Sequence, residues 1–172
     1  FDNNRHYSKD YDLMKGSYLG PYYSDKEILI TNKKFKTVYK RFDSFERLSK
    51  KVAKLISEGN VIGWFQGRSE FGPRALGNRS ILADPRNPEM QKKLNLKIKY
   101  REGFRPFAPS VLKERQNEYF IIPKEQNAYF MEKVFMFKDE YKDKLPGVVH
   151  FDGTGRLQTV SKEINAKYYK VI

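Results

Sequence analysis

The stretch of sequence from Val61 to Ser80 reads VIGWFQGRSEFGPRALGNRS. Its first five residues are apolar or glycine, which predicts a buried strand. The loop that follows, Gly67–Ser80, contains three glycines and three arginines. Glycine lets backbone N–H groups approach a bound anion closely, and arginine binds planar oxyanions through two parallel hydrogen bonds. Because open α/β sheets bind ligands at the carboxyl ends of their strands, this loop is the first candidate for an anion-binding site.

A purely structural alternative exists for the same loop, in which its arginines pair with the nearby acids Glu70, Asp84 and Glu89. The loop matches neither the Walker phosphate-binding pattern nor the dinucleotide-binding pattern, so those two folds lose support. In the preceding strand, Trp64 and Phe65 are expected to lie in the core, with stacking on adenine as the alternative.

Two further segments combine arginine with glycine and aromatic residues. In the first, Lys99–Phe107, we expect Lys99 and Arg101 at the end of a helix. Cations there interact with the helix dipole, worth about 0.3–1 kcal/mol, which explains those two residues without a ligand. The dipole does not explain Arg105 in the following loop. We therefore expect the cluster as a whole to be functional.

The other segment, His150–Arg156, reads HFDGTGR. His150 and Asp152 point to the same side if one strand runs through both, and histidine transfers protons near neutral pH. The alternative is a histidine that is only hydrogen-bonded near a strand end. The Gly-Thr-Gly sequence before Arg156 is again typical of a loop that binds an anion.

The charge of the chain is strongly positive, with 34 Lys and Arg against 21 Asp and Glu in 172 residues, a formal net charge of +13. Such a surplus indicates nucleic acid, an anionic membrane, a small polyanionic ligand or a solvated lysine-rich surface. The lysines are spread along the chain, whereas six of the 11 arginines fall between Arg68 and Arg105. Because arginine is the two-pronged binder of phosphate, this cluster is the feature that points to a ligand.

Several classes of protein are excluded by composition. The chain has no cysteine, which excludes disulfides, Cys-ligated zinc, iron–sulfur clusters and a cysteine nucleophile. Its two histidines cannot build a multi-histidine site, and we expect no metal ligands in this chain. A hard cation held by carboxylate and phosphate oxygens is the alternative. No apolar run approaches the ~20 residues that span a membrane, and no secretory signal is visible. We expect a cytoplasmic protein without a membrane partner.

Local patterns predict helices and strands that alternate along the chain. Ser24 and Glu27 have the spacing of a capping box, which predicts a helix from about Asp25. A second helix begins near Asp43 and ends at Gly59. Further strands are predicted over 80–83, 129–137, 147–151 and 156–160, and further helices from Asn87 and over 164–171. This alternation favours a mixed α/β (or α+β) fold.

These segments, with the chain around them, resemble the C-terminal region of the NodU-type carbamoyltransferases. The resemblance runs from about residue 18 to residue 160, and blocks of this length are far more specific than a short motif. It is carried by Tyr18–Pro21, Tyr23–Asp25, Gly63–Arg68, Glu70–Arg86, Lys99 with Arg101 and Glu102, Phe104–Leu112, His150–Thr154 and Arg156–Val160.

The resemblance implies a YrdC-like fold, a twisted mixed sheet flanked by helices, with a basic cavity. It implies that the chain binds carbamoyl phosphate and ATP, with Mg²⁺, and makes carbamoyl-adenylate. A separate N-terminal sugar-kinase-like domain would then transfer the carbamoyl group to an acceptor hydroxyl in a biosynthetic reaction. We expect residues 1–17 to be an N-terminal extension. Residues 18–172 would be the C-terminal domain, truncated at its end because a Thr-Ser-Phe-Asn element is expected beyond Ile172.

The resemblance also assigns residues to the site. Four residues would act on carbamoyl phosphate or on the adenylate: Lys99, Arg105, Arg156 and His150. Six others would bind the nucleotide or shape the cavity: Arg68, Arg74, Arg79, Ser80, Arg101 and Asp152. Clustered arginine and lysine suit this chemistry, because the transition state spreads negative charge over phosphoryl oxygens.

Two other hypotheses remain open from the sequence. The first is a nucleic-acid-binding YrdC-like module, for example for double-stranded RNA, which the charge and the mixture of aromatic residues with arginine would suit. The resemblance makes nucleic acid the weaker hypothesis. The second is a folded fragment that binds the ligands of the family but is inactive without its partner domain.

Overall fold

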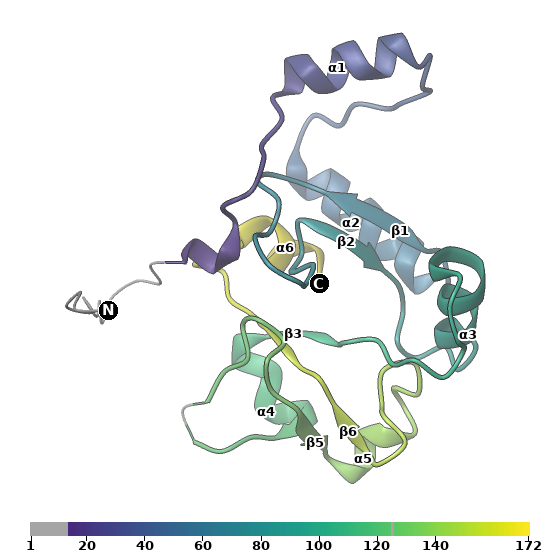
Figure 1. The fold of residues 1–172 in the computed structure, drawn as a ribbon, viewed down its shortest axis with the longest axis vertical. Helices are drawn as coiled ribbons and strands as arrows, with labels where there is room; N and C mark the ends of the chain where they lie inside the picture. Colours follow the sequence, from purple (N-terminus) through teal and green to yellow (C-terminus); the bar gives the residue numbers. More distant parts are fainter. Residues whose placement is uncertain (1–13, 125) are drawn as a thin grey trace, which may run out of the picture.

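The computed structural model describes residues 14–124 and 126–172 (Figure 1). Most of the expected N-terminal extension, residues 1–17, lies outside these residues; Lys15–Ser17 form a short 3₁₀ turn, η1. The structure confirms the expected mixture of helices and strands. Within the described residues, hydrogen bonds divide the strands among three small sheets.

The first sheet is a hairpin of β1 (Ile62–Phe65) and β2 (Arg79–Leu82), which run antiparallel with Phe65 opposite Arg79. The arginine-rich loop is therefore the connection of a hairpin. The rule that places ligands at the carboxyl ends of parallel strands does not apply to it. The expectation that both aromatic residues of this strand lie in the core is half correct: Trp64 is 7% exposed and Phe65 is 54% exposed. Neighbouring residues of a strand point to opposite faces, which explains the difference.

The other two sheets lie on the opposite side of the molecule from this hairpin (Figure 1). In one of them, β3 (Ser110–Leu112) pairs in parallel with β7 (Gln158–Val160). In the other, β5 (Phe135–Phe137) lies between two shorter antiparallel partners, β4 (Phe120–Ile121) and β6 (Thr154–Gly155).

Three predicted strands are shorter than expected or absent. Of residues 129–137, only the last three form a strand, and of residues 156–160 only Gln158–Val160 do. The strand predicted over 147–151 is wrong, because the chain turns there. The amide of Gly153 donates to the carbonyl of His150, and the amide of His150 donates to the carbonyl of Thr154. The apolar pair Val148 and Val149 packs in the core from this turn without being a strand.

The helices begin close to the predicted signals. α1 (Asp25–Lys34) has the full capping box of Ser24 and Glu27, as predicted. α2 (Phe45–Ser57) is capped by Ser44, one residue after the position predicted, and the chain leaves it at Gly59 with a φ of 83°. The short helices are η3 (Lys113–Arg115), α4 (Gln116–Tyr119), α5 (Asp139–Lys142) and α6 (Ala166–Val171).

The helix predicted from Asn87 begins later, as α3 (Met90–Leu94), and continues into a π-helical turn, η2 (Asn95–Lys99). Met90 and Leu94 are buried as the spacing predicts. The next residue of that face, Ile98, is 39% exposed, because the wider turn rotates it away from the core.

The described residues form two apolar clusters. One lies beneath the β4–β5–β6 sheet and contains Phe120, Ala128, Phe135, Phe137, Val148 and Leu157. The other joins α2, β1, β7 and α6 through Val52, Trp64, Val160, Tyr168 and Val171. Because Leu157 belongs to one cluster and Val160 to the other, the segment 157–160 connects them.

α1 projects from the rest of the molecule in Figure 1, and none of its residues is buried. Among the described residues, no helix combines the length and the apolar character needed to cross a bilayer.

We predict that Leu157→Ala lowers the free energy of unfolding by about 2–5 kcal/mol, because a fully buried leucine leaves a cavity when truncated. The matched control is Leu29→Ala on α1, where the leucine is 41% exposed. Urea denaturation followed by circular dichroism measures both. Equal effects of the two substitutions would contradict the described core.

Candidate anion-binding site

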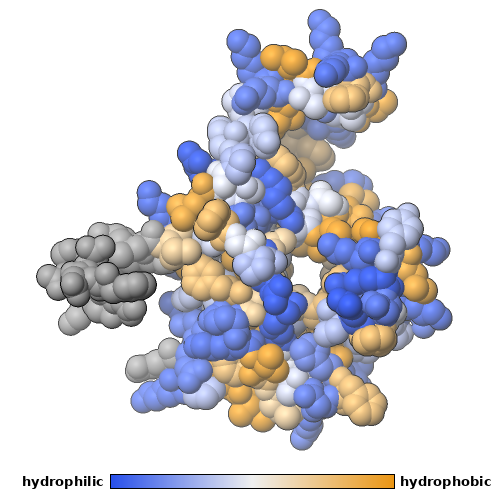
Figure 2. Space-filling view, in the orientation of Figure 1, coloured by the Kyte–Doolittle hydropathy of each residue, from blue (hydrophilic) through white to orange (hydrophobic). Residues whose placement is uncertain are grey.

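A cavity of about 770 Å³ lies between the β1–β2 hairpin and the β3–β7 pair, with the chain around Lys99–Phe107 at one side. Figure 2 shows the corresponding hollow in the middle of the molecular surface. Ligand pockets for small organic molecules have volumes of roughly 300–1,000 Å³, so the cavity is of nucleotide size.

The lining of the cavity is strongly cationic: Arg74, Arg86, Lys99, Arg101, Arg115 and Arg156. Two of these arginines are neutralised by carboxylates. Arg86 binds Asp84 through two guanidinium nitrogens, and the side-chain hydrogen bond lowers the pKa of that acid. Arg115 pairs with Glu118 at 2.8 Å. Within the described part of the chain, the other four cations form no ion pair.

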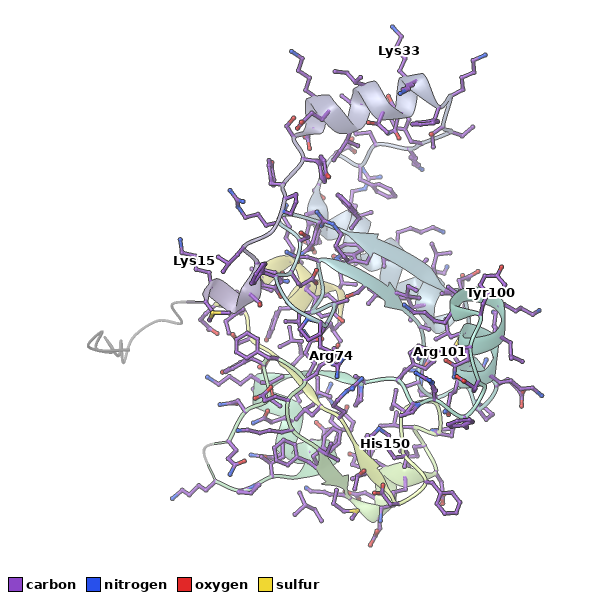
Figure 3. The ribbon with its side chains drawn as sticks, in the orientation of Figure 1. Lys15, Lys33, Arg74, Tyr100, Arg101 and His150 are labelled. Atoms are coloured by element: carbon purple, nitrogen blue, oxygen red, sulfur yellow. The ribbon has the colours of Figure 1, made fainter. Side chains whose placement is uncertain are left out.

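Arg156 lies between β6 and β7 and is half-buried. Its Nε atom is buried and has no hydrogen-bond partner among the described residues. Burial lowers the pKa of Arg156, and the positive charges of Arg74 and Arg101 lower it further. Arg156 is thus close enough to both of these guanidinium groups to be repelled by each of them. Figure 3 shows Arg74 and Arg101 on opposite sides of the hollow.

Arg101 is oriented by neutral partners. Tyr100 ends the π-helical turn in the left-handed conformation and reverses the chain, so that the amide of Arg101 donates to the carbonyl of Asn95. The Nε of Arg101 donates to Asn95 Oδ1 at 2.7 Å, and its guanidinium lies 4.9 Å from the centre of the Phe107 ring. Asn95 is fully buried. This arrangement fixes the direction of the side chain while keeping its full charge.

Three of the arginines expected in the site have other partners. Arg105 pairs with Glu102 at 2.9 Å and lies outside the cavity lining. Arg68 donates to the carbonyl of Gly20. Arg79 lies 3.5 Å from the Phe65 ring and donates to four backbone carbonyls, those of Pro21, Gln66, Gly67 and Asn78. Arg68 and Arg79 therefore hold the backbone of the hairpin loop in this structure.

The remaining predicted residues divide between the cavity and its neighbourhood. Lys99 and Ser80 line the cavity, and the Ser80 hydroxyl accepts a hydrogen bond from the Gly77 amide. His150 and Asp152 lie in the turn before Arg156 and do not line the cavity. Both contact Thr154, whose hydroxyl donates to Asp152 Oδ1 and lies 3.1 Å from His150 Nδ1.

The pKa of His150 is lowered by burial; Asp152 opposes this shift and Arg156 adds to it. The imidazole is therefore neutral at pH 7, and it adds no further positive charge to the group around Arg156.

Sequence reasoning missed Asn95, Gln158 and Tyr168, which hold an arginine or the chain near one, and it gave Glu70 only an ion pair with an arginine. Their residue types are common in loops and helices, and each acts on a partner that is distant in sequence or on the backbone.

For a metal ion the structure offers few ligands. The described residues contain no group of three or more His, Asp or Glu side chains that could hold one.

Comparisons with known proteins identify the family. The family model described as Carbamoyltransferase C-terminus matches residues 53–172. Nodulation protein NolNO of Sinorhizobium fredii is 52% identical over 73% of this chain and 18% of its own length. Nodulation protein U of the same species is 43% identical over 70% of this chain and 21% of its own length. An uncharacterized protein of Synechocystis is 43% identical over 94% of this chain and 29% of its own length.

The chain thus spans less than a third of the length of these relatives. The expected resemblance to the NodU-type proteins is confirmed, since the nodulation proteins are similar across most of the chain. The match of more than half of the chain to one family model shows that this chain belongs to the carbamoyltransferase C-terminal family.

Proposed function

We propose that this chain is the adenylate-forming part of an ATP-dependent O-carbamoyltransferase, which binds carbamoyl phosphate and ATP in the central cavity. One observation carries the proposal: the buried Nε of Arg156 has no partner within the described residues, although the Arg74 and Arg101 charges lie close by. A half-buried cation whose buried Nε lacks a hydrogen-bond acceptor is unfavourable. A bound polyanion would supply the missing hydrogen-bond acceptor and cancel the repulsion.

The chemistry of the reaction matches this charge distribution. Carbamoyl phosphate loses its phosphate to water, an oxygen of the resulting carbamate bonds to the α-phosphorus of ATP, and pyrophosphate leaves. Negative charge spreads over the phosphoryl oxygens in the transition state, so fixed guanidinium donors lower the barrier. Arg101, which Asn95 orients, and Arg156, whose Nε is unpaired, are the candidates for these donors, and Arg74 and Lys99 add charge to the cavity lining.

Among residues 14–124 and 126–172, no group of three or more acidic or histidine side chains could hold Mg²⁺. Asp84 is the carboxylate of the described cavity lining, and it is bound to Arg86. Magnesium commonly keeps several waters and binds through substrate phosphates, so it would be held mainly by the phosphates of ATP. Transfer to the acceptor hydroxyl would belong to an N-terminal sugar-kinase-like domain, in keeping with the greater length of the relatives. We place the reaction in the cytoplasm.

We predict that carbamoyl phosphate and ATP–Mg²⁺ each raise the thermal unfolding midpoint, because a ligand at 100 times its Kd adds about 2.7 kcal/mol of apparent stability. Pyrophosphate release that requires both ligands would establish the adenylate step. Stabilisation without pyrophosphate release would instead support the ligand-binding fragment. The absence of any shift with either ligand would contradict the proposed site.

We predict opposite effects of Arg156→Met on stability and on binding. Without ligand, the variant is more stable by ~0.5–1 kcal/mol, because the charge that Arg74 and Arg101 repel is gone. Its affinity for ATP or carbamoyl phosphate falls at least tenfold, the loss of roughly 1.4 kcal/mol. Calorimetry and thermal unfolding measure the two effects. The control is Arg47→Met on α2, whose arginine is exposed and paired with Asp43; it should leave ligand binding unchanged.

We predict that a short RNA duplex does not compete with ATP for the cavity, because the unpaired arginines line a hollow and not a flat face. Fluorescence anisotropy at 50 and 200 mM salt checks this. Tight duplex binding whose log K falls by about 0.7–0.9 per neutralised phosphate against log salt would favour the nucleic-acid hypothesis.

A further inference from the structure

The Arg74 side chain is placed by the backbone of its loop and not by contacts of its own. Within the described residues, the Arg74 side chain makes no hydrogen bond, ion pair or ring contact, yet its charge is close enough to lower the pKa of Arg156. It lies in the hairpin loop between Gly72 and Gly77, both of which have positive φ. A loop of this kind would be free to move Arg74 into solvent, away from the repelling charges, unless other contacts held it.

Glu70 supplies such contacts at the start of the loop. Its Oε1 accepts hydrogen bonds from the amides of Leu76, Asn78 and Arg79, at 2.6, 2.8 and 3.2 Å. All three amides follow Arg74 in the chain, so one carboxylate oxygen ties the end of the loop to its beginning. The structural alternative from the sequence, an ion pair of Glu70 with an arginine, is absent from the described residues.

The carbonyl of Leu76 is held from the opposite side. It accepts hydrogen bonds from Tyr18 Oη at 2.7 Å and from Gln158 Nε2 at 2.9 Å. Gln158 lies two residues after Arg156, on β7. Leu76 is therefore fixed relative to the strand that follows Arg156, and the distance between the two arginines depends on this junction.

The hydrogen bonds continue into the core. The side chain of Ser110 donates to Gln158, and the hydroxyl of Tyr168 donates to Ser110 at 2.8 Å. Burial raises the pKa of Tyr168 to about 12, so its hydroxyl remains a donor. The ring of Tyr168 also packs against Gly77, where an added Cβ would approach it to 2.3 Å. The loop is thus held in three ways: its amides bind Glu70, the Leu76 carbonyl binds Tyr18 and Gln158, and Gly77 packs against Tyr168.

From these contacts we infer that Glu70 is a positioning residue, which acts on the anion through Arg74 by holding the loop that presents Arg74 to the cavity. This inference rests on the proposed function for the identity of the anion. If Glu70 acted only through its charge, it would weaken anion binding, because a negative charge beside the cavity repels an anion. Removing Glu70 then weakens anion binding if it positions the loop, and strengthens binding if it acts only by its charge.

Calorimetric titration with pyrophosphate separates these two roles. Glu70→Ala raises the Kd for pyrophosphate at least tenfold, and Glu70→Gln, which retains an acceptor oxygen, raises it two- to fivefold. The matched control is Glu89→Ala, which removes an exposed carboxylate whose side chain makes no hydrogen bond among the described residues; it changes the Kd less than twofold. Unchanged or tighter binding by Glu70→Ala would overturn the inference.

A double-variant cycle tests whether Glu70 acts through Arg74. In an Arg74→Ala background, adding Glu70→Ala changes the Kd less than twofold, since the residue that the loop presents is already gone. Independent, multiplying effects would place the action of Glu70 elsewhere. A loss of folding, which would reduce both affinities together, is detected by thermal unfolding. If Glu70→Ala fails to fold, Glu70→Gln is used in the same cycle.

Hydrogen exchange provides a reading that does not depend on the ligand. In Glu70→Gln, exchange of the Leu76, Asn78 and Arg79 amides becomes faster, while exchange in α2 does not change. If the unmodified chain fails to bind pyrophosphate, the proposed function is wrong, and this measurement still decides whether Glu70 holds the loop. Equal exchange in both proteins refutes the positioning role.

Discussion

Repulsion of Arg156 by Arg74 and by Arg101 is the constraint on which the site depends. Like charges move apart unless the backbone that carries them is held. The fold holds each of them differently. Arg156 lies beside Leu157, which is fully buried, and Arg101 is bound to the buried Asn95. The loop of Arg74 is fixed at Leu76 by hydrogen bonds from both sides.

These three arginines differ from the ion-paired arginines in having no carboxylate partner within the described residues. Arg86, Arg105 and Arg115 bind carboxylates, which cancel their charge. In contrast, the side-chain partner of Arg101 is an amide, which orients a guanidinium and leaves its charge intact for a ligand. Arg68 and Arg79 form a third group, bound to backbone carbonyls, and they shape the hairpin loop. Arginines that look equivalent in the sequence therefore have three separate roles.

Local signals in the sequence predicted local structure well. The capping box at Ser24 and the end of α2 at Gly59 each depend on neighbours within a few residues. The run around Val148 was misread as a strand, because apolar residues packed from a turn have the same composition. The partners of the site could not be predicted either. Gln158 reaches Leu76 across 82 residues, and only the folded chain brings them together.

The two apolar clusters explain how the structure withstands the repulsion. Arg156 is flanked by Gly155, which packs on Phe137, and by Leu157, so it is anchored in the cluster beneath β4–β5–β6. The loop that carries Arg74 is anchored in the other cluster, because Gly77 packs against the Tyr168 ring. The arginines of the site therefore lie near the junction of the two apolar clusters. The β3–β7 pair and the hydrogen bonds of Gln158 hold this junction together. A site of this kind concentrates positive charge without a carboxylate in its centre, because packing, and not charge pairing, keeps the arginines in place.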